Sequence, residues 1–168
     1  MKKRMTKTGF ALLFSVLIAS IMLSIALAIF NIVYKELILS SAVKNSQFAF
    51  YAADAGLECA LYWDYKGKVF ATSTDSVLGA SGVTCNGTDI TAAVNTPISR
   101  TADAATTLFY LNFLPDAYCV SVTVRKESIP TKRTTIEGRG YNAGYDASTG
   151  DCSGSLDRKE ERGLLVTY

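Results

Sequence analysis

A long uncharged run near the N-terminus constrains this chain more than any other feature. No charged residue occurs between Thr8 and Tyr34, and the 24 residues from Phe10 to Val33 are mostly apolar. As an α-helix this run would be about 36 Å long, which is enough to cross the hydrocarbon core of a bilayer with some tilt. The sequence therefore predicts one transmembrane helix over residues 10–34.

The charges around this run predict its orientation. Lys35 and Glu36 cancel on the far side, whereas four basic residues precede the run: Lys2, Lys3, Arg4 and Lys7. The positive-inside rule then places the N-terminus in the cytoplasm, in a single-pass topology, and the rest of the chain outside the inner or cytoplasmic membrane.

Net charge bears on nucleic-acid binding. Without the four basic residues that precede the apolar run, 13 of the 17 basic residues remain against 15 acidic ones, a net charge of −2. This balance argues against direct nucleic-acid binding, which needs a basic face on the folded domain. We interpret the nearest basic cluster as a solvated hairpin end: Arg125, Lys126, Lys132 and Arg133.

Three fates of the N-terminal segment are open. A secretory signal could be cut after Ala26-Leu27-Ala28, so that the mature protein starts near Ile29, although the apolar run is longer than a signal core. The segment could instead stay uncut as a single-pass anchor. In the third case a short leader, residues 1–9, is cut after Gly9 and Phe10 begins an intact helix.

The helical pattern continues beyond the membrane run. From Lys35 to Trp63 there is no Pro, and no Gly before Gly56, so one helix from about Phe10 to Asp64 is expected. Residues 35–65 form an amphipathic continuation, with apolar residues recurring at three- and four-residue steps. These residues are expected to pack on the rest of the domain: Phe48, Tyr51, Ala52, Ala55, Cys59 and Tyr62.

The remaining chain, residues 66–168, has the patterns of a small β-rich domain. Alternating apolar residues predict strands around 109–113 and 119–124, separated by a tight connection at Pro115-Asp116, and further strands at 133–141 and 164–168. Asn86-Gly87 predicts a hairpin turn, although with Thr88 it also matches a glycosylation sequon. Three or four antiparallel strands under one long helix make an α+β ladle.

Four cysteines in an exported domain predict two disulfides, and sequence permits three connectivities. Alternation places Cys119 on the polar sheet face, away from Cys59 on the helix, so a bond to the loop residue Cys152 is favoured. Cys59 would then pair with Cys85. Free thiols in a reducing compartment are the alternative.

No catalytic or cofactor-binding pattern emerges from the sequence. His is absent, the cysteines form no metal-binding spacing, and no Ser lies in a nucleophile motif, so we expect neither an enzyme nor a bound cofactor or metal. The glycine-rich segment from Gly138 to Gly154 lacks the Lys of a phosphate loop. It is expected to be a surface loop, in which Tyr141 and Tyr145 could bind a partner.

The leader and the start of the apolar run resemble a type IV prepilin. The basic segment Lys2 to Thr8 is followed by Gly9, Phe10 and an uninterrupted apolar helix. The resemblance implies that a prepilin peptidase cuts between Gly9 and Phe10 and that Phe10 is then N-methylated. Phe14 stands where most pilins have a Glu, which is thought to pair with the N-terminal amine of a neighbouring subunit. This departure favours a minor or tip subunit over a major pilin.

A second segment, Ser46 to Ala60, is similar to the signature Q-x-x-x-x-A-A-[ED]-A-G-L-x-x-A of minor pilins of the PilX family. Physically it predicts an Ala- and Gly-rich helix face pressed closely onto a sheet. The two resemblances imply a structural subunit of a type IV pilus-like filament, assembled with other pilin subunits on a membrane platform. A type II secretion pseudopilin, or an exported binding module, is the alternative.

Overall fold

The computed structural model describes residues 8–73, 79–114, 118–154 and 159–168, with side chains from Phe10 on. It contains one long N-terminal helix and a small antiparallel sheet, which is the α+β layout expected from the sequence. The chain forms two compact units, Met1–Ala42 and Val43–Tyr168, and each is described by itself.

Helix α1 (Thr8–Tyr62) is 55 residues long and contributes to both units. In the first unit every described side chain from Phe10 to Leu37 is exposed. Within the described ranges, α1 is the one helix that is long and apolar enough to cross a membrane, judged by length and composition. A signal sequence meets the same criterion, so this segment has the properties of either an anchor or a signal.

The end of α1 lies within two residues of the expected position. A five-residue π-helix, η1 (Trp63–Gly67), follows it directly. The chain then turns at Lys68, whose φ of 48° lies in the left-handed region and ends the helical run.

The sheet of the second unit is an antiparallel meander. Its five strands are neighbours in chain order: β3 (Ser99–Arg100), β4 (Ala104–Phe113), β5 (Tyr118–Glu127), β6 (Arg133–Tyr141) and β7 (Glu161–Thr167). The expected strands are present, β4 begins earlier than its alternating pattern indicated, and β3 was not predicted. The connection expected at Pro115-Asp116 lies outside the described residues.

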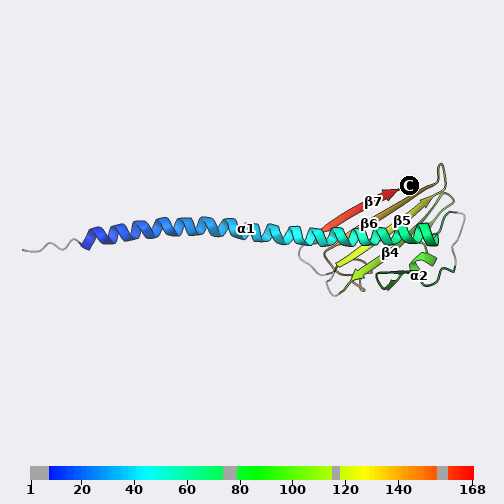
Figure 1. Ribbon diagram of the computed structural model, residues 1–168, viewed down its shortest axis with the longest axis horizontal. Helices are drawn as coiled ribbons and strands as arrows, with labels where there is room; N and C mark the ends of the chain where they lie inside the picture. Colours follow the sequence, from blue (N-terminus) through cyan, green and yellow to red (C-terminus); the bar gives the residue numbers. More distant parts are fainter. Residues whose placement is uncertain (1–7, 74–78, 115–117, 155–158) are drawn as a thin grey trace, which may run out of the picture. The chain divides into compact units, whose positions relative to one another are not determined.

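Alternation along the strands separates the two faces of the sheet. The outer half of α1 covers one face of the sheet (Figure 1). Val120, Val122 and Val124 of β5 are buried, and Val120 and Val122 lie against Gly56 of the helix. Their cross-strand partners on β6 are Gly140, Gly138 and Ile136. Directly opposed residues share a face of an antiparallel pair, so the two glycines also lie under the helix.

Those glycines allow α1 to lie very close to the sheet. A Cβ atom at Gly140 would collide with the carbonyl oxygen of Ala49 and lie 2.6 Å from the backbone nitrogen of Ala53. A Cβ atom at Gly138 would lie 2.8 Å from the carbonyl oxygen of Ala53. On the helix side, a Cβ at Gly56 would lie 2.8 Å from a methyl group of Val122. Each of these close contacts therefore depends on a glycine on one of the two surfaces.

The packing face of the helix differs from the expected one. Of the residues assigned to it, Ala52 is buried, and Phe48 and Cys59 are half-buried. In contrast, Ala55 is exposed, Tyr51 is 64% exposed and Tyr62 is 56% exposed. The buried positions are rotated by about one residue: Ala49, Ala52, Ala53, Gly56, Leu57 and Ala60. The large aromatic side chains are excluded because the valines of β5 leave no room beneath the helix axis.

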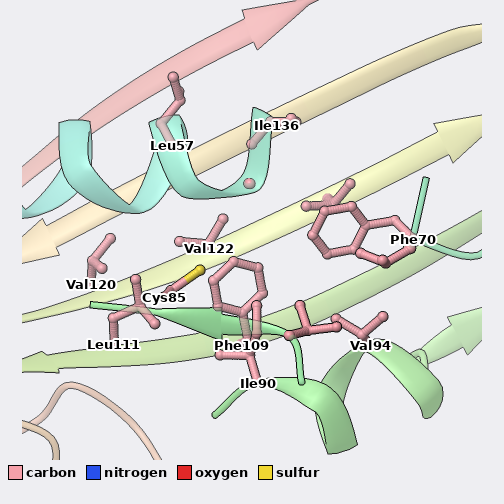
Figure 2. Close-up of a cluster of buried hydrophobic side chains, with 14 of the residues drawn as sticks. Leu57, Phe70, Cys85, Ile90, Val94, Phe109, Leu111, Val120, Val122 and Ile136 are labelled. Atoms are coloured by element: carbon pink, nitrogen blue, oxygen red, sulfur yellow. The ribbon is translucent and has the colours of Figure 1, made fainter. Parts of the chain in front are cut away.

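The core lies between the outer half of α1 and the sheet (Figure 2). It also includes buried side chains from the segment between η1 and β3, such as Phe70 and Ile90. Leu57 enters it from the helix, while Phe109 and Leu111 enter it from β4. Phe70 stacks on Phe109 with ring centroids 6.1 Å apart. The short helix α2 (Thr91–Asn95) adds Val94 to the same cluster.

The predicted turn at Asn86-Gly87 is confirmed. It joins β1 (Thr84–Cys85) to β2 (Thr88–Asp89) in a two-stranded antiparallel hairpin. Asn86 and Gly87 both have positive φ, 47° and 76°, as the two central residues of a type I′ hairpin turn require.

Candidate interaction surfaces

The candidate processing site lies at the start of α1. The helix begins at Thr8, so Gly9 and Phe10 are in its first turn, whereas the basic leader residues 1–7 lie outside the described part of the chain. Phe10 and Phe14 are both exposed, and their rings stack on one face with centroids 6.5 Å apart. An aromatic pair therefore occupies the position at which the resemblance leads one to look for a carboxylate.

Both disulfides are present in the favoured pairing. Cys59 of α1 bonds to Cys85 of β1, which ties the helix to the small hairpin. Cys119 of β5 bonds to Cys152, which fastens the segment after β6 to the second sheet face. No free cysteine is found.

The segment containing Tyr141 and Tyr145 is folded onto the sheet face opposite α1. The Tyr145 backbone N–H donates to the Asn112 side chain, and the Tyr145 ring lies 5.5 Å from that of Tyr110. Tyr141 ends β6, on the same face, and Lys159 lies 4.5 Å from its ring centroid. The two tyrosines are thus part of a cover over the end of the sheet, rather than a loop that stands away from it.

Burial and nearby charge perturb these phenols. Partial burial raises the pKa of Tyr110 above its ordinary value, and the negative charge of Asp151 adds to the effect. Partial burial also raises the pKa of Tyr141, against an opposing hydrogen bond with Ser121. Both phenols are therefore neutral at physiological pH.

An apolar groove of about 330 Å³ runs beside α1. Its wall contains four of the helix residues that were expected to face the sheet: Phe48, Tyr51, Ala52 and Ala55. Phe48 closes one part of it by stacking on Tyr118, with ring centroids 4.6 Å apart. The exposed Leu114 lies at its rim. The aromatic residues of the helix therefore present a surface to the surroundings of the domain instead of filling its core.

The second unit contains a buried polar cluster that the sequence patterns did not predict. Asp64, which is 7% exposed, receives a hydrogen bond from the Tyr168 hydroxyl at 2.7 Å and pairs with the Lys126 ammonium at 2.5 Å. Burial, and then the hydrogen bond to Asp64, raise the pKa of Tyr168 above its ordinary value. The cluster links the end of α1 to β5 and to the residue after β7.

This cluster corrects the interpretation of the basic hairpin end. Arg125 and Arg133 are exposed, but the Lys126 side chain is only 17% exposed and is used internally. The alternation of β5 contained the necessary signal, because Lys126 is in phase with Val122 and Val124 on the covered face.

No metal site is found among the described residues, where no three His, Cys, Asp or Glu side chains are grouped to hold an ion. Comparisons with protein-family models, with curated proteins and with solved structures found no match. The function of this chain is therefore inferred from its own residues and from the resemblance of its N-terminal segments to prepilins.

Proposed function

We propose that this chain is a minor subunit of a type IV pilin-like filament, inserted in the membrane as a precursor and incorporated through residues 10–34. One observation carries the proposal. Helix α1 runs without interruption from Thr8 to Tyr62, so a single helix supplies both a fully exposed apolar segment and the face that packs on the sheet. A segment that only anchored the domain in a membrane would not need to be continuous with the helix that packs on the sheet.

The packing of the outer half of α1 supports the same proposal. The Ala- and Gly-rich segment that resembles the signature of minor pilins is the segment that lies against β5 and β6. Because this face is occupied within the domain, the opposite, aromatic side of the helix remains available to neighbouring subunits. Tyr51 and Tyr62 are both more than half exposed there.

The membrane segment has the composition needed for assembly through apolar contact. Phe14 is uncharged, and no charged side chain occurs between Phe10 and Val33. The proposed partners are prepilin peptidase during processing, then other pilin subunits and the assembly platform. The mature chain would leave the membrane and enter an extracellular filament.

Processing provides the experiment. The Gly9→Val variant should keep its leader, whereas Ala28→Leu, which blocks the A-x-A site with an apolar residue, should be processed normally. Intact mass of the membrane-extracted chain measures both variants. If Ala28→Leu blocks processing and Gly9→Val does not, the chain is a signal-cleaved secreted domain and the proposal is wrong.

A type II secretion pseudopilin would be processed in the same way. Only the composition of the filament into which the chain is incorporated distinguishes it from a pilus subunit.

A further inference from the structure

A hollow of about 290 Å³ opens at the hairpin between β5 and β6. Its volume is at the lower end of small-molecule sites. Its charged lining consists of Lys126, Glu127, Lys132 and Arg133, with the hydroxyl groups of Ser128 and Thr134 among them. A second hollow, of about 650 Å³, shares Thr72, Lys126 and Tyr168 with it.

The cationic side chains of this hollow outnumber its acidic side chains three to one. Arg133 is the cross-strand partner of Glu127, but the Glu127 carboxylate instead accepts from Arg125 at 2.8 Å. Within the described part of the chain, neither Lys132 nor Arg133 forms an ion pair. Arg125, which is not part of the lining, therefore neutralises Glu127, and the positive charges of Lys132 and Arg133 remain.

Lys126 is held in place at the boundary between the two hollows. Its ammonium pairs with the buried Asp64 carboxylate, which Tyr168 holds from the other side. An ammonium group has three N–H donors, and this pairing occupies one of them. The lining therefore contains a donor that is already ordered before a ligand arrives, which lowers the entropic cost of binding.

We propose that this hollow binds an oxyanion, the phosphate or carboxylate group of a small polar ligand. Lysine and arginine side chains beside hydroxyl groups are the donors that such groups accept from, and hydrogen bonds between ions are the strong ones. A cationic ligand is opposed by the lining charge. A long polyanion is opposed by the net charge of −2 that remains after the leader charges are set aside. The site is separate from the assembly role of α1.

Isothermal titration of the full chain in a nonionic detergent tests the proposal. Glucose 6-phosphate and glucuronate are the charged probes, and glucose is the neutral control. At about 10 mM ionic strength, where screening is weak, at least one charged probe should bind saturably with a Kd below about 1 mM, and glucose should not bind. The probe that binds more tightly identifies the oxyanion as phosphate or carboxylate.

The variant pair separates this site from general charge attraction. Lys132→Gln/Arg133→Gln should weaken binding at least about tenfold, since two charge-assisted contacts are removed. Lys44→Gln/Arg162→Gln removes the same two residue types outside the hollow and should leave the Kd within about twofold. All four positions are exposed, so folding should persist, and circular dichroism checks it. Absence of saturable binding, or an equal loss in both double variants, overturns the proposal.

Discussion

Gly140→Ala is the most informative perturbation of the helix–sheet contact. The new methyl group would meet backbone atoms rather than the flexible end of a side chain. It would overlap the Ala49 carbonyl oxygen and lie 2.6 Å from the Ala53 nitrogen. Ordinary van der Waals contact begins at 3.4 Å, so at the Ala53 nitrogen alone the gap must widen by 0.8 Å. Either α1 or β6 must therefore move.

The energetic cost follows from the separation of two close-packed surfaces. Overpacking a core typically costs about 1–3 kcal/mol, and a clash with backbone on both sides belongs at the upper end of that range. Replacing Gly with Ala recovers about 0.4–1 kcal/mol by restricting the unfolded chain. The net expectation is a loss of about 2 kcal/mol in the free energy of unfolding.

Trp63 provides the assay. It is the only tryptophan in the chain, it follows α1 directly, and its indole N–H donates to the Thr84 carbonyl at 3.0 Å. Its fluorescence should therefore report release of the helix end from the domain. Urea unfolding of the full chain in nonionic detergent gives the free energy of unfolding, and an unchanged slope shows that the transition is comparable between variants.

Gly163→Ala is the matched control. Gly163 lies in β7, the neighbouring strand, and a Cβ atom there has no other atom within 4 Å. The same substitution should therefore be neutral or stabilise the protein by up to about 1 kcal/mol. If Gly140→Ala is as stable as Gly163→Ala, the helix does not lie as close to β6 as the structure has it, and the reasoning fails.

Three further predictions concern the disulfides and the buried cluster. Replacing either cysteine pair with alanines should cost about 3–4 kcal/mol, because the bonds close segments of 26 and 33 residues; equal urea midpoints with and without the bonds would contradict this. Lys126→Met should cost about 3–5 kcal/mol in the same assay by leaving the Asp64 carboxylate buried and unpaired, and Asp64→Leu/Lys126→Met should recover most of that loss. The raised pKa of Tyr168 should make stability fall as pH rises above 10, where the unfolded phenol ionises first, so wild type should lose more stability between neutral pH and pH 11 than Tyr168→Phe; parallel pH profiles would exclude this role.

Local patterns were sufficient to predict much of the fold. The absence of Pro defined α1 to within a few residues, and the alternation around Val120 and Val122 defined the covered face of the sheet. That same alternation placed Cys119 on the other face, which is why its pairing with Cys152 could be favoured. Each of these inferences uses only neighbours in sequence.

The large aromatic side chains of α1 were placed wrongly on its packing face. Tyr51 and Tyr62 were assigned to that face because apolar residues recur there at three- and four-residue steps, but the distance between helix and sheet is set by the side chains of the sheet. Gly138 and Gly140 lie in phase with Ile136 on the covered face of β6, and this was the available signal. Glycines in a strand often mark a close backbone approach, which agrees with the Ala- and Gly-rich helix face that residues 46–60 predicted.

The buried cluster could not be found from neighbouring residues alone. Asp64, Lys126 and Tyr168 are far apart in sequence, and the strand order is what brings them together. The sequence did contain a partial signal. Lys126 and Tyr168 are both in phase with the covered faces of their strands, where a polar side chain requires a partner.

The central claim is that the chain enters a filament through a helix that begins at Phe10. Mass spectrometry of sheared surface filaments, from cells that make the protein, tests it most directly. The account predicts that the chain is present in that fraction with N-methylated Phe10 as its first residue. A mature chain that begins at Ile29, or that is absent from filaments while abundant in the membrane or medium, would contradict the account.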